Sequence, residues 1–411
     1  MKKRIELNEA RKLIIDNLQD FSTERVSLMD GLGRVCAGDI KAPMHQPPFD
    51  RSPLDGFALR AEDTAKAEEG HPVELKIVDW IYAGDRPEAQ IEEGEAARIM
   101  TGAPIPPGAD CVIRQENTEW DEDRVRLQKN LKPGQNYAPA GEDIEEGDLL
   151  VKDGTLLRSP HMGVLASMGM ETVDVYPCPE ASVITTGNEL KPLGSELEEG
   201  KIYNSNNYMI SSRLEETGAK VLDNIVVTDD RDRIMKAVDE EITHCDFLLT
   251  TGGVSVGEKD LMLEVFEELG AEILFWKLNL KPGTPIACAR YRDTIIFGLS
   301  GNPAAALITY DLLVRHILVR INRMNHLGLQ RTKAIFADEF PRSSGTRRFL
   351  RAWLVRSPDK NIVRLSRGKQ RPGVLKSTLE SNCYIDIPAG SPPLQEGEEV
   401  EVFSLPDQYH Y

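Results

Sequence analysis

The residues best suited to chemistry lie in four polar segments, each of which follows a short apolar run. The segments are residues 185–189, 228–230, 250–253 and 298–303. If each apolar run is a strand of an open α/β sheet, the segments cluster at the carboxyl edge, where such sheets bind ligands. Glu189, Asp229 and the later Asp260 would then approach one another, and a Mg²⁺ ion would relieve their repulsion. Each acid taken alone is better explained as a helix cap or a solvated side chain, whereas three acids at consecutive sheet ends favour the metal site.

The third segment is the most informative. The apolar run at residues 247–249 predicts a buried strand, and Gly252 and Gly253 then allow backbone angles that residues with a Cβ resist. The chain continues through Ser255 to Asp260, where an amphipathic pattern predicts a helix. A strand, a glycine turn, hydroxyls and an acid together are typical of a ligand site. The alternative is a tight turn with an N-capping acid.

The fourth segment ends at a predicted helix N-terminus, whose unpaired N–H groups and positive dipole favour an oxyanion. Ser300, Gly301 and Asn302 are therefore candidate binding residues, and Lys277 and Lys281 could supply ammonium groups nearby. A structural turn and a solvated strand edge are the alternatives. The chain has neither a Walker A motif nor a Gly-x-Gly-x-x-Gly after a strand, which disfavours a P-loop NTPase and a Rossmann dehydrogenase.

The elements that must position these residues divide into several domains. Strand and helix patterns alternate over residues 179–327 and predict a doubly wound, mostly parallel α/β sheet covered on both faces. Short β runs with Gly and Pro turns predict a small β-rich domain at 46–141, and similar runs predict a C-terminal β-barrel at 328–411. Residues 1–45 and 142–178 form a discontinuous helical and linker domain. The predicted fold class is therefore multidomain α/β plus β.

A proline-rich loop at residues 47–58 carries a further acid, Asp55, directly before Gly56. Asp-Gly is a common turn pair, so Asp55 could simply form a turn. A loop this constrained can instead hold a carboxylate in place at a domain junction.

Composition excludes several classes of function. The 411 residues carry a net charge of −18, which disfavours nucleic-acid binding but permits carboxylate clusters that need a divalent cation. No apolar run reaches the ~18–20 residues of a membrane span, and no apolar core follows the basic start, so we expect a cytoplasmic protein without membrane contact. The 6 cysteines form no Cys-x-x-Cys pair, and the 7 histidines show no His-x-x-x-His spacing. A zinc ribbon, a dithiol site and a His-ligated metal therefore have little support.

In their order and spacing, these motifs resemble the MoeA/gephyrin E-domain family, the molybdopterin molybdenumtransferases of molybdenum cofactor biosynthesis. The motifs are residues 47–58, 101–106, 141–144, 186–190, 202–206, 251–260, 281–283 and 300–303. The resemblance covers nearly the whole chain. The central domain alone is also similar to the MogA-like adenylyltransferases, whereas the proline-rich loop and the flanking β domains favour MoeA.

The resemblance implies a four-domain homodimer, with dimerisation through the discontinuous N-terminal domain. It places the active site between the central domain of one subunit and the Asp55-bearing domain of the other. The implied substrates are adenylylated molybdopterin and molybdate: Mg²⁺ assists cleavage of the phosphoanhydride, molybdate enters the dithiolene and AMP leaves. A MogA-type adenylyltransferase is the candidate partner that supplies the adenylylated substrate.

Residue by residue, the resemblance supports a specific candidate site. The candidate catalytic residues are Asp55, Glu189, Asp229, Lys277 and Lys281. The candidate substrate-binding residues are Thr101, Asp143, Gly252, Gly253, Ser255, Ser300, Gly301, Asn302, Arg351 and Ser377. The candidate Mg²⁺ ligands are Glu189, Asp229 and Asp260. The chain departs from the family at Asn188, Thr284 and Ala305, where aspartate, lysine and serine are frequent, so the molybdate subsite is expected to differ.

Two other functions remain compatible with the sequence. One is adenylylation of molybdopterin by ATP, a step that does not need the Asp55 loop. The other is a non-catalytic binding or scaffold protein of the same fold, which would show an exposed partner groove and no turnover.

Overall fold

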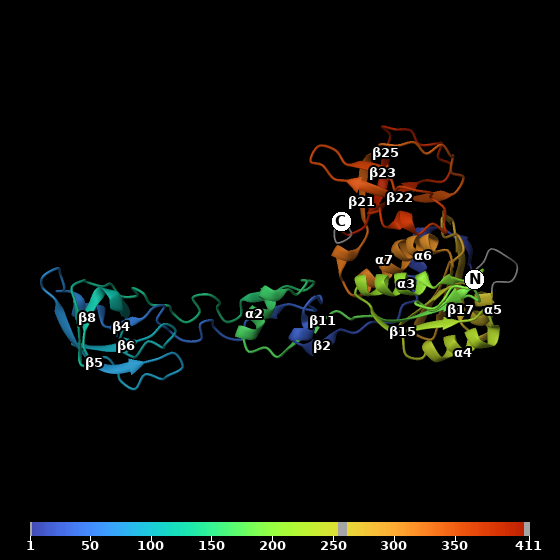
Figure 1. The fold of residues 1–411 in the computed structure, drawn as a ribbon. Coiled ribbons are helices and arrows are strands. Elements are labelled where there is room, and N and C mark those ends of the chain that lie inside the picture. The colour runs from blue at the N-terminus through green and yellow to red at the C-terminus, as the bar shows by residue number, and fades with distance from the viewer. Residues whose placement is uncertain (1, 254–260, 407–411) are drawn as a thin grey trace. The chain divides into compact units, whose positions relative to one another are not determined.

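The computed structural model describes residues 2–253 and 261–406, and two of the candidate residues, Ser255 and Asp260, lie outside these ranges. The chain divides into two compact units, which are described one at a time. The first consists of Met1–Glu24 together with Val175–Tyr411, and the second of Arg25–Asp174. Figure 1 shows their helices and strands.

The first unit is built on a seven-stranded sheet. In spatial order the strands are β1 (Lys2–Ile5), β17 (Glu272–Leu278), β19 (Ala287–Tyr291), β20 (Thr294–Leu299), β16 (Phe247–Thr251), β12 (Glu180–Thr186) and β15 (Lys220–Val227). Every neighbouring pair is parallel except those made by β19, which runs antiparallel to both of its neighbours. The predicted mostly parallel sheet is therefore confirmed.

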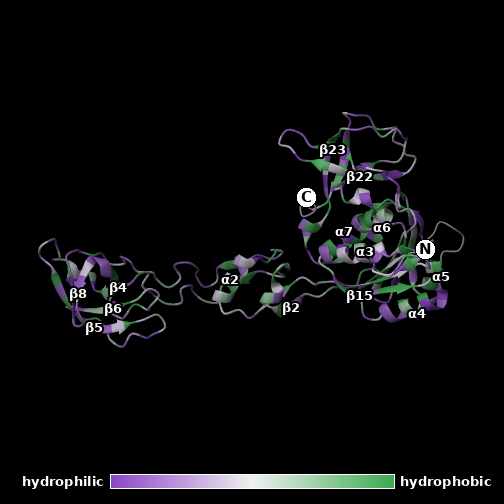
Figure 2. Cartoon of the chain, in the orientation of Figure 1, coloured by the Kyte–Doolittle hydropathy of each residue, from purple (hydrophilic) through white to green (hydrophobic). Residues whose placement is uncertain are grey.

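Helices cover both faces of this sheet. They are α1 (Leu7–Ile15), α3 (Ser205–Glu216), α4 (Arg231–Glu241), α5 (Leu261–Glu268), α6 (Pro303–Thr309) and α7 (Arg315–Ile321), the last two joined by a π-helical turn at Tyr310–Val314. Along β16, Phe247 and Leu249 face the core beneath α1, α3, α6 and α7, while Leu248 faces the core beneath α4 and α5. Successive side chains of a strand point to opposite faces, so a strand buried on both reads as a continuous apolar run. Hydrophobic residues are concentrated in this layered region (Figure 2).

A closed five-stranded barrel follows the sheet in the same unit, as predicted. Its strands are β21 (Gln330–Phe336), β22 (Arg347–Val355), β23 (Ile362–Leu365), β24 (Cys383–Ile387) and β25 (Glu399–Ser404). The ring closes because β22 pairs with both β23 and β24, and the short strand β18 (Leu280–Lys281) adds to its edge.

A buried polar network joins the barrel to the α/β layers. In the π-helical turn, Asp311 accepts a hydrogen bond from Arg315 Nε at 2.9 Å and another from the Tyr384 hydroxyl of β24 at 2.6 Å. All three side chains are buried, so each charge and hydroxyl needs the partner that the network supplies. The barrel is thereby fixed next to the loops that follow the sheet.

The second unit contains a six-stranded sheet in the order β7, β4, β6, β5, β9, β8. The strands are β4 (Gly56–Leu59), β5 (Val73–Ile81), β6 (Glu95–Ile99), β7 (Cys111–Arg114), β8 (Thr118–Trp120) and β9 (Arg124–Leu127). The same unit also holds helix α2 (Ser159–Ser167) and two short strand pairs. These pairs are β3 (Ile40–Lys41) with β10 (Leu149–Val151), and β2 (Glu24–Ser27) with β11 (Thr172–Val175).

The predicted division into four domains stays a prediction. One detail differs from the expected grouping of residues 1–45 with residues 142–178. Strand β1 instead adds to the central sheet beside β17, and α1 contributes Ile14 to the core of that sheet. Among the described residues, no helix is both long and apolar enough to cross a membrane.

Candidate active site

A polar cleft of about 890 Å³ opens at the carboxyl edge of the seven-stranded sheet. The strands β12, β15, β16 and β20 all point their carboxyl ends toward it, because they run parallel. Seven of the predicted site residues line this cleft: Glu189, Asp229, Gly252, Gly253, Ser300, Gly301 and Asn302. The structure therefore brings the four polar segments together, as the sheet topology required.

The glycines of the third segment are needed for close approach. Gly252 has φ +94°, and a Cβ there would lie 2.3 Å from the carbonyl oxygen of Thr186. Gly253 has φ +66°, and a Cβ on Gly301 would lie 3.4 Å from Gly252 Cα. Three strand ends thus pack backbone against backbone, which leaves main-chain groups exposed at the floor of the cleft.

Five buried polar groups along the cleft lack a hydrogen-bond partner among the described residues. They are the hydroxyls of Thr185, Thr186 and Thr251, the amide nitrogen of Asn204 and the amide oxygen of Asn206. A buried polar atom without a partner costs about 1–3 kcal/mol, so these five groups are candidates for hydrogen bonds to a polar ligand. None of these residues was among the candidate site residues. Their only signal in the sequence is the paired threonines at two strand ends and the Asn-Ser-Asn run before a helix.

The loop after β20 is held in place by its neighbours. Asn206 donates its amide hydrogen to the Gly301 carbonyl at 2.9 Å, and the Asn302 N–H bonds to the Ser300 hydroxyl at 3.2 Å. In the first turn of α6, the Ala304 N–H bonds to the carbonyl of Pro372 at 3.0 Å. The barrel domain therefore already uses one of the backbone N–H donors that the sequence offered for an oxyanion, so fewer N–H groups are available at this helix terminus than expected.

The two described acids of the cleft, Glu189 and Asp229, both have exposed carboxylates. Asn188 links their turns: its N–H bonds to Asp229 Oδ2 at 3.3 Å, and its side-chain oxygen accepts the Asp229 N–H at 3.1 Å. This bridge gives the family departure at Asn188 a structural role. Carboxylate, hydroxyl and amide oxygens form a hard donor set that fits Mg²⁺. The third predicted ligand, Asp260, lies outside the described residues.

The predicted lysine pair does not line the cleft. Lys277 has φ +72°, and its ammonium group lies 3.7 Å from the centre of the Trp276 ring. Lys281 is exposed in β18, beside the barrel strand β22. Thr284, the second departure, uses its hydroxyl to bond the Leu280 carbonyl at 2.5 Å, so it secures the Lys281 turn. The anion-balancing role of the two lysines stays a prediction.

Arg351 and Ser377 are both buried, and their contacts are with the protein itself. Arg351 Nε bonds to the Ser377 hydroxyl at 2.9 Å, and the guanidinium also bonds to the carbonyls of Lys369 and Arg371 at 3.2 Å. These bonds hold the barrel loop that brings Gly373 to the edge of the cleft. The geometry therefore gives the pair a positioning role, and direct contact with a ligand stays a prediction.

The second candidate region lies in the second unit, around Asp55. Its carboxylate accepts two hydrogen bonds from Thr101, one from the backbone N–H at 2.8 Å and one from the hydroxyl at 2.7 Å. These bonds, with a smaller contribution from the nearby charge of Arg98, hold the pKa of the Asp55 carboxyl below its ordinary value. Two candidate residues that the sequence analysis named separately, Asp55 and Thr101, are thus in direct contact, and the acid is ionised at neutral pH.

The backbone beside Asp55 is fixed by sterics. A Cβ on Gly56 would lie 1.9 Å from the carbonyl oxygen of Ile113, so glycine alone fits between the adjacent strands. At the base of the same loop, the Asp143 N–H bonds to the Gln46 carbonyl at 3.0 Å, and the Asp143 side chain is exposed.

Arg98 supports the Asp55 turn from inside the β domain, and nothing in the sequence pattern singled it out. Its guanidinium donates to the Gly56 carbonyl at 2.8 Å and to the side-chain oxygen of Gln115. The backbone N–H of Gln115 in turn bonds to the backbone carbonyl of Asp55 at 3.1 Å. The guanidinium also lies 4.9 Å from the ring centre of Phe57 and 5.0 Å from that of Trp120. The turn that carries Asp55 is therefore held by a buried cation, Arg98, that the sequence did not identify.

Together, the fold and these two regions define a multidomain α/β protein with a cleft for a polar ligand and a separate, preorganised carboxylate. Family models for the MoeA N-terminal region (domain I and II), a probable molybdopterin binding domain and the MoeA C-terminal region (domain IV) match residues 5–169, 182–320 and 333–405. A molybdopterin molybdenumtransferase of Bacillus subtilis (strain 168) is 36% identical over 410 residues, which cover 98% of this chain and 95% of the relative.

Further relatives agree along the whole chain. A molybdopterin molybdenumtransferase of Staphylococcus aureus (strain COL) is 33% identical over 398 residues, or 97% of this chain and 95% of the relative. A solved structure of the molybdopterin biosynthesis MoeA protein from Pyrococcus horikoshii is 32% identical, with a TM-score of 0.80 and coverage of 98% and 99%. A solved structure of the molybdopterin biosynthesis MoeA protein from Pyrococcus horikoshii OT3 gives a TM-score of 0.68 at 32% identity, with coverage of 98% and 100%. The chain belongs to the MoeA family.

Proposed function

We propose that this protein acts in molybdenum cofactor biosynthesis as a molybdopterin molybdenumtransferase: it inserts molybdate into adenylylated molybdopterin and releases AMP. The observation that carries the proposal is the set of five unpartnered buried polar groups in a cleft that also holds Glu189 and Asp229. A pterin with a phosphoanhydride offers the donors and acceptors that such a cleft lacks. Full-length relatives named for this activity support the same conclusion.

In the proposed site, the cleft binds the adenylylated substrate. The substrate bonds to the five unpartnered polar groups of the cleft, which are the hydroxyls of Thr185, Thr186 and Thr251 and the amide groups of Asn204 and Asn206. The Gly252 turn, which has no room for a Cβ, admits the phosphate end of the pterin close to the backbone.

Mg²⁺ is the proposed cofactor. Glu189 and Asp229, with Asp260, would hold it, and when bound it supplies charge neutralisation at the phosphoanhydride. Lys277 and Lys281 would balance the remaining negative charge of phosphate and molybdate, although neither lines the cleft in this structure.

Asp55 is the proposed reactive carboxylate. Because Thr101 holds its pKa below the ordinary value, it enters the reaction ionised and can accept a proton or a hydrogen bond rather than donate a proton. Thr101 is thereby a positioning residue for Asp55. We also propose that the protein is a cytoplasmic homodimer that takes its substrate from a MogA-type adenylyltransferase.

The test is release of AMP from adenylylated molybdopterin by the purified full chain, with and without molybdate and Mg²⁺. The proposal predicts release that requires both. Consumption of ATP with molybdopterin and no molybdate would instead identify an adenylyltransferase, and binding of the adenylylated pterin without turnover would identify a non-catalytic binding protein.

A further inference from the structure

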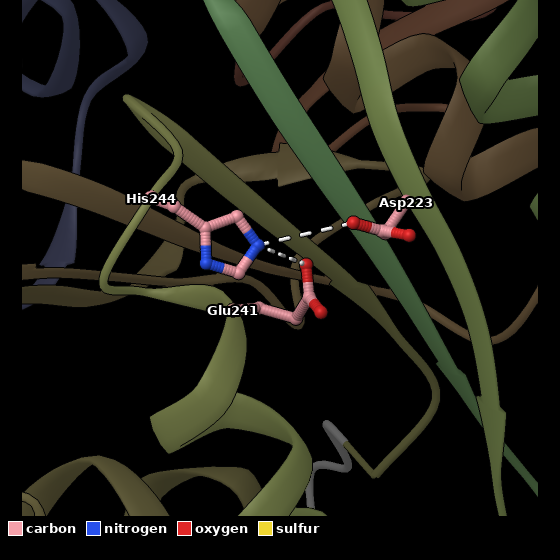
Figure 3. Close-up of side chains that lie close together, drawn as sticks. All are labelled: Asp223, Glu241 and His244. Carbon is pink, nitrogen blue, oxygen red and sulfur yellow. Dashed lines mark ion pairs between the residues drawn. The ribbon is translucent and has the colours of Figure 1, made fainter.

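Three potential metal ligands meet at the amino edge of the seven-stranded sheet, the edge opposite the cleft. Asp223 lies in the edge strand β15, Glu241 is the last residue of α4, and His244 lies in the turn that leads to β16. Figure 3 shows the carboxylates of Asp223 and Glu241 pointing toward the same ring nitrogen of His244. Among the described residues, no other group of three or more such side chains comes as close together.

The spacing of the three groups suits a shared ion better than direct bonds. His244 Nε2 lies 3.4 Å from Glu241 Oε2 and 3.8 Å from Asp223 Oδ2. Zinc ligands lie about 2.0–2.2 Å from the metal, which places two ligands of one tetrahedral ion about 3.4 Å apart. A direct charge-assisted hydrogen bond would be about 2.7–2.9 Å long. The separation from Glu241 therefore matches one edge of a coordination tetrahedron, and the separation of 3.8 Å from the exposed Asp223 carboxylate is about 0.4 Å longer than such an edge.

Glu241 supplies an independent indication. Only 7% of its side chain is exposed, and Oε2 has no hydrogen-bond partner among the described residues. A buried carboxylate without a hydrogen bond is costly, and an ion held with the neighbouring imidazole would remove that cost. The unpartnered oxygen is the one that faces His244.

The neighbouring contacts leave the imidazole nitrogen available. His244 Nδ1 lies 3.3 Å from the Thr243 hydroxyl, a contact that orients the ring with Nε2 toward the two acids, as outer contacts do around metal ligands. Cys245 directs its thiol to the Glu241 carbonyl at 3.2 Å, so it is already engaged and is not a fourth ligand.

We propose that Asp223, Glu241 and His244 bind one divalent transition-metal ion, with zinc as its representative, and leave its remaining position to water. An imidazole nitrogen with two carboxylates favours zinc and its neighbours over Mg²⁺ or Ca²⁺, which take oxygen ligands. The ion cross-links the edge strand β15 to the turn before β16 and is separate from the candidate active site. A search for paired histidines fails here because the ligands come from a strand, a helix end and a turn.

The test is titration of the metal-free full chain with Zn²⁺ by calorimetry, comparing wild type with His244→Ala, Glu241→Gln and Asp223→Asn. Glu240→Gln is the matched control, because Glu240 is an exposed neighbour on α4 whose carboxylate pairs with Lys236, and its substitution removes the same charge. We expect one site in wild type and control, weakened at least tenfold in the three ligand variants. Zinc taken up by the cleft acids would appear equally in all five proteins. Equal affinity in all five, or no saturable site in wild type, overturns the proposal.

Two further measurements test the proposal even if Glu241→Gln does not fold. Asp223 is exposed, so Asp223→Asn leaves the core intact, and Zn²⁺ should raise the thermal unfolding midpoint of wild type and control by several degrees but not that of this variant. X-ray absorption of the zinc-loaded protein should show scattering from one imidazole, which His244→Ala abolishes. An imidazole signal that persists in His244→Ala would place the ion elsewhere and contradict the assignment.

Discussion

The two candidate regions of this protein differ in how far their polar groups are hydrogen-bonded by the protein itself. The cleft at the sheet edge buries five polar atoms that have no partner among the described residues. At the other region, Asp55 receives two hydrogen bonds from Thr101, and the turn that carries it is bonded to Arg98 and Gln115. Unpartnered groups destabilise the free protein and can be satisfied by a ligand, whereas a carboxylate oxygen that already accepts two hydrogen bonds is positioned before any ligand arrives. This difference supports the proposal that the cleft binds the substrate and that the Asp55 loop supplies the reactive carboxylate.

The largest expected effect is that of Asp55→Ala. Removing a positioned proton acceptor typically lowers a rate about 10²–10⁴-fold, so we expect molybdate-dependent AMP release to fall about a thousandfold with substrate affinity nearly unchanged. Asp85→Ala is the matched control, because Asp85 also accepts a loop N–H bond in the same domain. A control variant as slow as Asp55→Ala would show that the loss comes from the fold of the domain.

The rigidity of the Asp55 turn can be tested with Gly56→Ala. The new Cβ would meet the Ile113 carbonyl at 1.9 Å, so we expect a loss of about 2–4 kcal/mol in the free energy of unfolding, measured by denaturant titration. Gly163→Ala in helix α2 meets nothing within 4 Å and should stabilise by about 0.5–1 kcal/mol. If Gly56→Ala were as stable as wild type, the close approach at this turn would be wrong.

In the cleft, we expect a substitution to weaken substrate binding without lowering the free energy of unfolding. Thr251→Val removes a buried hydroxyl without a partner, so the free energy of unfolding should stay constant or rise by up to about 1 kcal/mol. Affinity for adenylylated molybdopterin should fall about five- to tenfold, because one ligand bond is lost. Thr309→Val, whose hydroxyl bonds to the Ala305 carbonyl at 2.9 Å, should be less stable and bind normally. Normal affinity in Thr251→Val would remove this hydroxyl from the site.

The smallest expected effect is a shift in pH dependence. Thr101→Val removes the hydroxyl bond to Asp55 and keeps the backbone bond, which is the larger cause of the lowered pKa. The pKa of Asp55 should then rise part of the way toward its ordinary value. Because the proposed reaction uses the ionised form of Asp55, kcat/KM should begin to fall at a higher pH than in wild type as the solution is acidified. An unchanged acid limb would mean that Asp55 does not control this ionisation.

Much of the fold followed from the sequence because the central strands are buried on both faces. Apolar runs such as residues 247–249 could only be buried strands or short helices, and the alternation with amphipathic segments decided between them. The sequence pattern does not mark strand β19, because its hairpin with β20 turns at Arg292 and Asp293 without a glycine, although Arg292 has φ +52°.

The candidate site was only partly visible in the sequence. Acids and glycines at strand ends are informative as residue types, so Glu189, Asp229 and Gly252 could be selected. Thr251 could not be distinguished from any other strand threonine, since its significance is the absence of a partner in three dimensions. Arg98 was invisible for the same reason: a single charge in an apolar strand shows neither its burial nor its bond to Gly56.

The central claim, that binding and chemistry belong to different regions, is tested most directly by pairing equilibrium binding with single-turnover AMP release in Asp55→Ala and Thr251→Val. We predict that Asp55→Ala binds adenylylated molybdopterin like wild type and does not release AMP. Thr251→Val should bind more weakly but turn over its bound substrate at the wild-type rate. The opposite pattern, with binding lost in Asp55→Ala and the bound-state rate lost in Thr251→Val, would contradict the account.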